Sequence, residues 1–231
     1  MSTPVCLAID IWSDVMCPWC IIGYKQLHRA LDELGGEIEA DIRWHPFELN
    51  PDMPPEGEDM AQHIMRKYGT GPTESATGQL RQIAAEAGYN MAYQGETDEN
   101  GKEIPQRLWN TLNAHKLLHW TREKQGNDAQ TRLKLALFDA HFQQRRNISD
   151  PETLIAIAKG AGLDVEGAAD AMRDEALTAQ IREEERAAME KGISSVPMMV
   201  VEQRFMIPGA QQPDVYVASL RKVVARVSDT D

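Results

Sequence analysis

The chain has 231 residues and a formal net charge of −12 at pH 7. This charge argues against a nucleic-acid-binding role and against a role at an anionic membrane surface, because both require a positive surface. The length suffices to bury a core without disulfide crosslinks, and no apolar run approaches the roughly 20 residues of a membrane span.

The first four residues lack the basic flank and long apolar core of a signal peptide, so we expect a cytoplasmic protein. In that reducing compartment a Cys-x-x-Cys pair is more often catalytic or redox-sensing than a structural crosslink.

Residues 5–12 are almost uninterrupted apolar positions rich in β-branched side chains, which predicts a central strand. After a turn at residues 13–14 comes Cys17-Pro18-Trp19-Cys20. From Cys20 to Leu34, apolar residues recur at steps of three and four, which predicts a helix that ends at two glycines. The cysteine pair therefore lies where a strand passes into a helix.

This position suits redox chemistry. Cys17 falls at the first helical turn, where unpaired N–H groups and the helix dipole favour a thiolate, so we expect an exposed thiol with a lowered pKa. Cys20 begins the buried stripe and can resolve a mixed disulfide on Cys17. Pro18 fits the first turn, where a missing N–H donor costs little.

The alternatives are a metal site or an accidental pair. Zinc would require a second pair of ligands, and the remaining cysteine, Cys6, lies inside the predicted strand. We therefore expect no metal, and we expect Cys6 to be a small buried hydrophobic residue.

Residues 38–44 alternate apolar and polar side chains and predict a strand, parallel to the first through a right-handed crossover. From about residue 59 to 191 we find no convincing strand. Helical periodicity appears at 60–68, 80–87, 109–120, 133–142, after Asp150-Pro151 and at 175–191, and residues 94–102 form a polar loop. Residues 197–201 and 204–207 predict a hairpin, followed by a helix from 213 to 227.

This order of elements resembles the α/β thioredoxin-like fold with an inserted all-helical domain, as in the DsbA family, and more closely its FrnE-like branch. The resemblance covers nearly the whole chain. It implies a discontinuous thioredoxin-like domain of residues 1–58 and 192–231, with a mixed sheet, and a helical domain of residues 59–191. The matching residues are Ser13-Asp14, Cys17 to Cys20, Ile22-Gly23, residues 46–51 and 67–69, Asn110-Thr111, Ala114-His115, Val196-Pro197 and residues 209–211.

The resemblance further implies a cis peptide bond before Pro197, packed against the cysteine pair, with the backbone of Val196 pairing with an extended substrate. We place Trp19 with these two residues in substrate binding. Methionines at positions 16, 198 and 199 either form an adaptable contact surface for protein substrates or fill the core.

Three further side chains are candidates for supporting roles. Asp10 either relays the proton of Cys20 or is a carboxylate satisfied at the strand end. Asp14 precedes the motif. His115 either lines the cleft between domains or is a core histidine, and its i, i+4 spacing with His119 suits a metal but lacks a third ligand.

We therefore expect a thiol–disulfide oxidoreductase or disulfide isomerase that acts on protein or small-molecule substrates. It would need no cofactor beyond the Cys17–Cys20 disulfide, with glutathione as a candidate co-substrate. One alternative is a glutathione-dependent isomerase or transferase, similar to the kappa-class and hydroxychromene-carboxylate isomerase enzymes, which carry serine where Cys17 stands. Another is a non-catalytic, redox-responsive binding module. The oligomeric state stays open, with a homodimer as one alternative.

Overall fold

A four-stranded mixed sheet carries the cysteine motif in the computed structural model, which describes residues 4–71 and 73–228. The strand order is β2-β1-β5-β6. β1 (Val5–Ser13) runs parallel to β2 (Ile38–Pro46) and antiparallel to β5 (Met198–Val201), which pairs antiparallel with β6 (Phe205–Pro208). The predicted mixed sheet and hairpin are confirmed.

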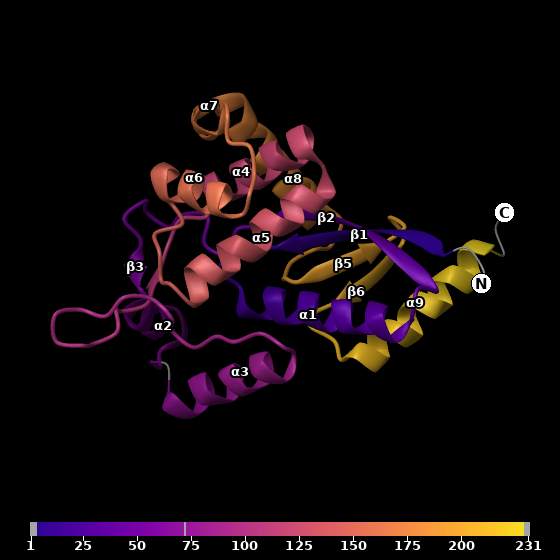
Figure 1. The fold of residues 1–231 in the computed structure, drawn as a ribbon, viewed down its shortest axis with the longest axis horizontal. Coiled ribbons are helices and arrows are strands. Elements are labelled where there is room, and N and C mark those ends of the chain that lie inside the picture. The colour runs from indigo at the N-terminus through magenta and orange to yellow at the C-terminus, as the bar shows by residue number, and fades with distance from the viewer. Residues whose placement is uncertain (1–3, 72, 229–231) are drawn as a thin grey trace.

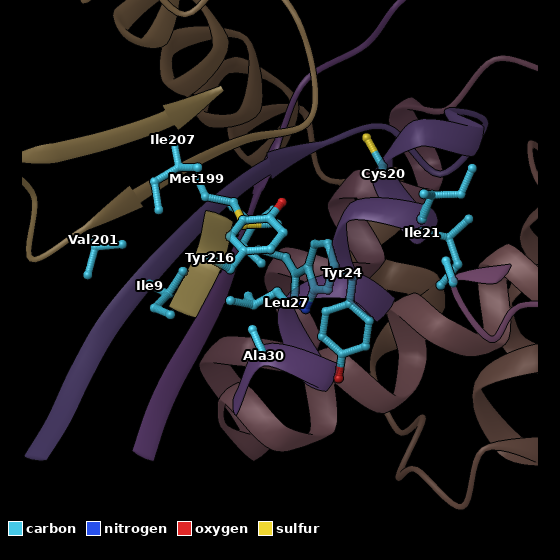
Figure 2. Packing of buried hydrophobic residues seen from close by; sticks show 14 of the residues in the cluster. Ile9, Cys20, Ile21, Tyr24, Leu27, Ala30, Met199, Val201, Ile207 and Tyr216 are labelled. Carbon is cyan, nitrogen blue, oxygen red and sulfur yellow. The ribbon is translucent and has the colours of Figure 1, made fainter. Parts of the chain in front are cut away.

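Two helices cover one face of this sheet. α1 (Pro18–Glu33) lies beside α9 (Pro213–Ser228) beneath the strands (Figure 1). Figure 2 shows how Leu27 and Ala30 of α1 and Tyr216 of α9 face Ile9 and Met199 of the sheet. Alternation along β1 sends Ile9 and Ile11 into this core. The apolar face of α1, which begins at Cys20, is therefore fixed against the strands that flank the motif.

The inserted helices pack around α4 (Leu112–Gln125) and α5 (Asn127–Phe142). The others are α2 (Met60–Tyr68), α3 (Glu74–Glu86), α6 (Pro151–Gly160), α7 (Ala168–Arg173) and α8 (Glu175–Glu190). Asp59, Thr73, Asp150 and Asp174 each accept a backbone N–H bond at a helix start. α5 also packs on β2, so the insert contacts the sheet directly.

Several expectations about the insert and its surroundings were wrong. The insert is not all-helical, because β3 (Glu58–Asp59) pairs antiparallel with β4 (Arg107–Leu108), and two-residue strands leave no periodic pattern to detect. The helix predicted from residue 109 begins at Leu112, whose N–H binds the side chain of Asn110. Cys6 is exposed rather than buried, because it lies near the start of β1, before the residues that pair with β5.

Within the described ranges, no helix combines the length and the apolar character that crossing a membrane requires.

Candidate functional site

The two cysteines of the motif are both free thiols at the start of α1. β1 ends at Ser13, a short turn follows, and Cys17 is the N-cap residue of α1 with Pro18 in the first turn, as predicted. The two thiols hydrogen bond to each other. Cys20 is fully buried and Cys17 is only 3% exposed, so the expectation of an exposed Cys17 was wrong.

The segment around Val196 explains the burial of Cys17. Sγ of Cys17 lies 3.7 Å from the carbonyl oxygen of Val196, and the Val196–Pro197 peptide bond is cis, as expected. A Cβ atom at Gly23 would lie 3.2 Å from Cγ of Pro197, so glycine lets α1 approach this segment closely. Trp19 remains 44% exposed and marks the solvent side of the site.

A buried carboxylate lies directly before the motif. Asp14 accepts hydrogen bonds from the N–H groups of Met16 at 3.3 Å and Leu49 at 2.8 Å, and its Oδ1 is 3.8 Å from Nε2 of His115. Burial alone would raise the pKa of Asp14, but His115 and the Leu49 N–H together lower it. Asp14 is therefore an ionised group enclosed in the protein.

A buried lysine supplies the opposite charge. Nζ of Lys134, on α5, donates to the carbonyl oxygen of Ser13 at 3.2 Å and lies 5.3 Å from the ring centre of Trp44 and 5.2 Å from that of Phe138. Burial lowers the pKa of Lys134 to about 8, against the attraction of Cys20 and Asp14. The inserted helices therefore place a cation beneath the redox pair.

These surroundings divide the charge between the two thiols in a way that we did not expect. Burial opposes ionisation of Cys20, but its hydrogen bonds with Cys17 and Ser13 and the charge of Lys134 lower its pKa. The hydrogen bond with Cys20, burial and the charge of Cys20 raise the pKa of Cys17. The two thiols therefore titrate as one coupled pair, and the predicted lowering of the pKa at Cys17 was wrong because its hydrogen bond with Cys20 and its burial raise it.

Asp10 does not reach this site. Its carboxylate is buried on the opposite face of β1 from Ile9 and Ile11, where it pairs with Arg43 at 3.0 Å and His45 at 2.8 Å. The alternative of a satisfied carboxylate is therefore confirmed and the relay role is wrong, because strand alternation turns Asp10 away from α1. Cys20 is contacted by the backbone of Asp14, whereas the charge of the Asp14 carboxylate acts on Cys17.

The remaining candidates are buried. Met16, Met198 and Met199 are at most 7% exposed, which confirms the core alternative over the contact surface. His115 is buried beside Asp14, whereas His119 pairs with Glu184, with 3.4 Å between Nδ1 and Oε1. In residues 4–71 and 73–228, no three His, Cys, Asp or Glu side chains gather as they would around a metal ion.

Sequence reasoning missed Lys134 and His141. With Phe138 they follow the i, i+4, i+7 spacing of one helix face, and Leu133 and Leu137 make that side of α5 apolar. Two titratable residues on an apolar helix face are the signal that could have identified them.

Comparisons with known proteins identify the family of the chain. The family model of the DSBA-like thioredoxin domain matches residues 8–221. The crystal structure of the probable DsbA oxidoreductase SCO1869 from Streptomyces coelicolor is 27% identical, with a TM-score of 0.80, over 95% of this chain and 90% of that chain. The uncharacterized protein YwbO of Bacillus subtilis is 24% identical over 216 residues, which are 90% of this chain and 92% of YwbO.

A more distant structure resembles the chain in fold alone. The cytosolic disulfide reductase DsbM from Pseudomonas aeruginosa, solved with GSH, is 18% identical with a TM-score of 0.59. The alignment covers 95% of this chain and 100% of that one.

Proposed function

Because the chain belongs to the family of DSBA-like thioredoxin domains, we propose that it is a thiol–disulfide oxidoreductase in which Cys17 attacks and Cys20 resolves. The observation that carries this proposal is the free thiol pair at the start of α1, with the two thiols hydrogen bonded and Lys134 lowering the pKa of one of them. Only a thiolate attacks a disulfide, and the lowered pKa of one thiol favours loss of one proton from the pair.

The proposed reaction begins with a proton transfer within the pair. The Cys20 thiolate accepts the proton of Cys17 along their hydrogen bond, which leaves the thiolate on the cysteine nearer to the surface. Sγ of Cys17 then attacks one sulfur of the substrate disulfide. A bond forms between Cys17 and that sulfur, the substrate S–S bond breaks, and the other sulfur leaves as a thiolate and takes a proton from solvent.

The second step oxidises the cysteine pair to its disulfide. Cys20 gives its proton to the departing second substrate sulfur, with Lys134 stabilising the charge on Cys20, and attacks Sγ of Cys17. The Cys17–Cys20 disulfide forms and the second substrate thiol leaves, so two electrons have passed from the pair to the substrate. Two molecules of a thiol such as glutathione would return two electrons. With the cytoplasm as the expected compartment, disulfide reduction is the proposed direction.

The backbone around Val196 supports the binding of extended protein substrates. Its carbonyl lies 3.7 Å from the Cys17 thiol, and the exposed ring of Trp19 lies on the same end of α1. A peptide paired with this backbone would bring its disulfide to Cys17.

The test is insulin reduction with glutathione as reductant, in wild type and three serine variants. We expect Cys17→Ser to lose turnover completely. In Cys20→Ser, Cys17 should still attack the substrate, but the variant should accumulate a mixed disulfide on Cys17, visible by intact-mass spectrometry. The exposed Cys6→Ser is the matched control and should keep the wild-type rate. A wild-type rate no higher than that of Cys17→Ser would instead support a non-catalytic binding module.

A further inference from the structure

A pocket of about 490 Å³ lies on the face of the sheet that α1 and α9 leave open. All four strands of the sheet line it, together with the segment after α8 and the turn between β5 and β6. Its volume lies within the range of small-molecule sites, about 300 to 1,000 Å³. Because side chains alternate along β1, a molecule bound in this pocket would lie on the opposite face of the sheet from α1 and the redox pair.

The apolar part of the pocket comes from several elements. Trp12 of β1, Val200 of β5 and Met206 of β6 line it, and Ile193, from the segment after α8, lies with them. Met206 is 46% exposed and Trp12 is half-buried, so both side chains keep apolar area in contact with water. This surface favours a ligand with an apolar body, because binding would remove apolar area from water on both sides.

The charged side chains of the pocket are three cations and one carboxylate. Asp10 is balanced within the protein by Arg43, with 3.0 Å between Nε and Oδ1 and 3.1 Å between Nη2 and Oδ2, and by Nε2 of His45 at 2.8 Å. Lys191 and Arg204 are exposed, and the side chain of neither forms an ion pair or hydrogen bond with the described residues. The pocket therefore concentrates positive charge in a chain whose net charge is −12.

We propose that this pocket binds a small organic anion, with its acidic group paired with Lys191 and Arg204 and its apolar body against Trp12 and Met206. An arginine fork and a lysine ammonium both pair with carboxylates and with phosphates. A phosphate monoester carries nearly two negative charges at pH 7, so it should engage both cations better than a carboxylate does. The site does not depend on the cysteine pair or on the proposed function.

The test uses three probes with the same aromatic body. These are 1-naphthyl phosphate, 1-naphthoate and the uncharged 1-naphthalenemethanol. By calorimetry at pH 7 we expect saturable binding of the phosphate, weaker binding of the carboxylate, and binding of the alcohol that is about tenfold weaker than that of the phosphate or less. The order of the two anions distinguishes a phosphate ligand from a carboxylate ligand, and saturable binding of either anion supports the site. Cys17→Ser/Cys20→Ser should bind the anions like wild type.

Charge substitutions localise the acidic group. Lys191→Gln and Arg204→Gln each remove one unpaired cation at an exposed position, so each should weaken binding of naphthyl phosphate about fivefold, and the double variant about twentyfold. Lys222→Gln, at an exposed position of α9 outside the lining, makes the same change in net charge and should leave binding unchanged.

A second pair of variants tests the apolar part. Met206→Glu places a carboxylate in the pocket and should abolish binding of both anions, because like charges repel. Val215→Glu makes the matching change at a 41% exposed position of α9 outside the lining and should bind them like wild type. Absence of saturable anion binding to wild type, equally tight binding of the alcohol, or equal weakening by Lys222→Gln would overturn the inference.

Discussion

Lys134 supplies a positive charge that acts on the buried thiol of the cysteine pair. Its ammonium group is buried among Trp44, Phe138 and the end of β1, and its attraction for Cys20 opposes the burial that would keep that thiol protonated. An opposite charge nearby favours the ionised form of a group, and the effect is larger where water is excluded.

We predict that Lys134→Met raises the pKa of Cys20 and slows disulfide reduction at pH 7 roughly tenfold, because a smaller fraction of the pair is ionised. Titration of thiolate absorbance against pH measures the pKa, and the reduction rate should recover at higher pH. Lys124→Met, at an exposed position of α4, is the control. An unchanged thiol pKa in Lys134→Met would refute the role given to this lysine.

The burial of Glu48 leads to a second prediction at this scale, on how the free energy of unfolding depends on pH. Its side chain is fully buried between Glu185 and Arg182, and burial, together with the charge of Glu185, raises its pKa to about 8. In the unfolded chain the pKa is near its ordinary value of 4.5. The folded state therefore binds more protons than the unfolded state between these values, and the free energy of unfolding falls as pH rises from about 4.5 to 8.

We expect Glu48→Gln to remove this fall of the unfolding free energy with rising pH. The variant should match wild type near pH 4.5 and exceed it above pH 8 by several kcal/mol at most, at about 1.4 kcal/mol per pKa unit. Urea unfolding at a series of pH values measures the difference, with Glu183→Gln, an exposed position on the same helix as Glu185, as control. A difference that does not depend on pH would contradict the prediction.

At this scale the sequence predicted the cysteines but not their environment. Cys17, Cys20 and Pro18 could be placed because their chemistry depends on local spacing at a helix start. The burial of Cys17 by Val196 and the charge from Lys134 come from segments more than 100 residues away, so no local pattern contains them. Alternation along β1 decided between the two interpretations of Asp10 only when the sheet face that α1 covers was known.

At the scale of elements, the hairpin that ends in β6 turns through two residues with positive φ. Glu202 and Gln203 have φ of 53° and 54°, a conformation that side chains with a Cβ disfavour and two-residue hairpin turns require. Glu202 has compensating contacts, because its Oε1 accepts from the N–H of Ala8 at 2.6 Å and its own N–H donates to the Ala8 carbonyl at 2.9 Å. The turn therefore also continues the pairing between β1 and β5.

We predict that Gln203→Gly stabilises the protein by about 0.5 to 1 kcal/mol, because glycine adopts positive φ without the steric cost. Glu202→Gly relieves the same conformation but loses the side-chain bond to Ala8, so it should bring no gain. Denaturant midpoints compare the two. An equal gain in both variants would show that the Ala8 contact contributes nothing.

Element boundaries show the same limit of sequence reasoning. The hairpin, α8 and α9 follow from periodicity over many residues, and their predicted positions agree with the structure to within a few residues. The pairing of β3 with β4 joins residues almost 50 positions apart through two-residue strands. Such a short ladder is set by the packing of the loops that carry it, and not by its own sequence.

At the scale of the whole molecule, the inserted helices and the sheet are joined by hydrogen bonds as well as by apolar contact. β2 is an edge strand, and Gln130 of α5 pairs with it as a neighbouring strand would: Oε1 accepts from the N–H of Trp44, and Nε2 donates to its carbonyl, each at 2.9 Å. This side chain covers the open edge of the sheet at its centre. The same helix carries Lys134, so the hydrogen bonds that hold α5 on β2 also position the cation of the redox site.

We predict that Gln130→Leu costs about 2 to 4 kcal/mol of unfolding free energy, because it leaves the buried N–H and carbonyl of Trp44 without partners. Thr131→Val, which removes only the 3.0 Å bond from the indole Nε1 of Trp44 to Oγ1 of Thr131, should cost about 1 kcal/mol. Unfolding followed by both far-ultraviolet circular dichroism and tryptophan fluorescence should give one coincident transition in each variant, because the helices and the sheet share this contact. Two separate transitions in wild type would mean that the insert folds independently of the sheet. Gln130→Leu would then lower the unfolding free energy of the edge strand alone.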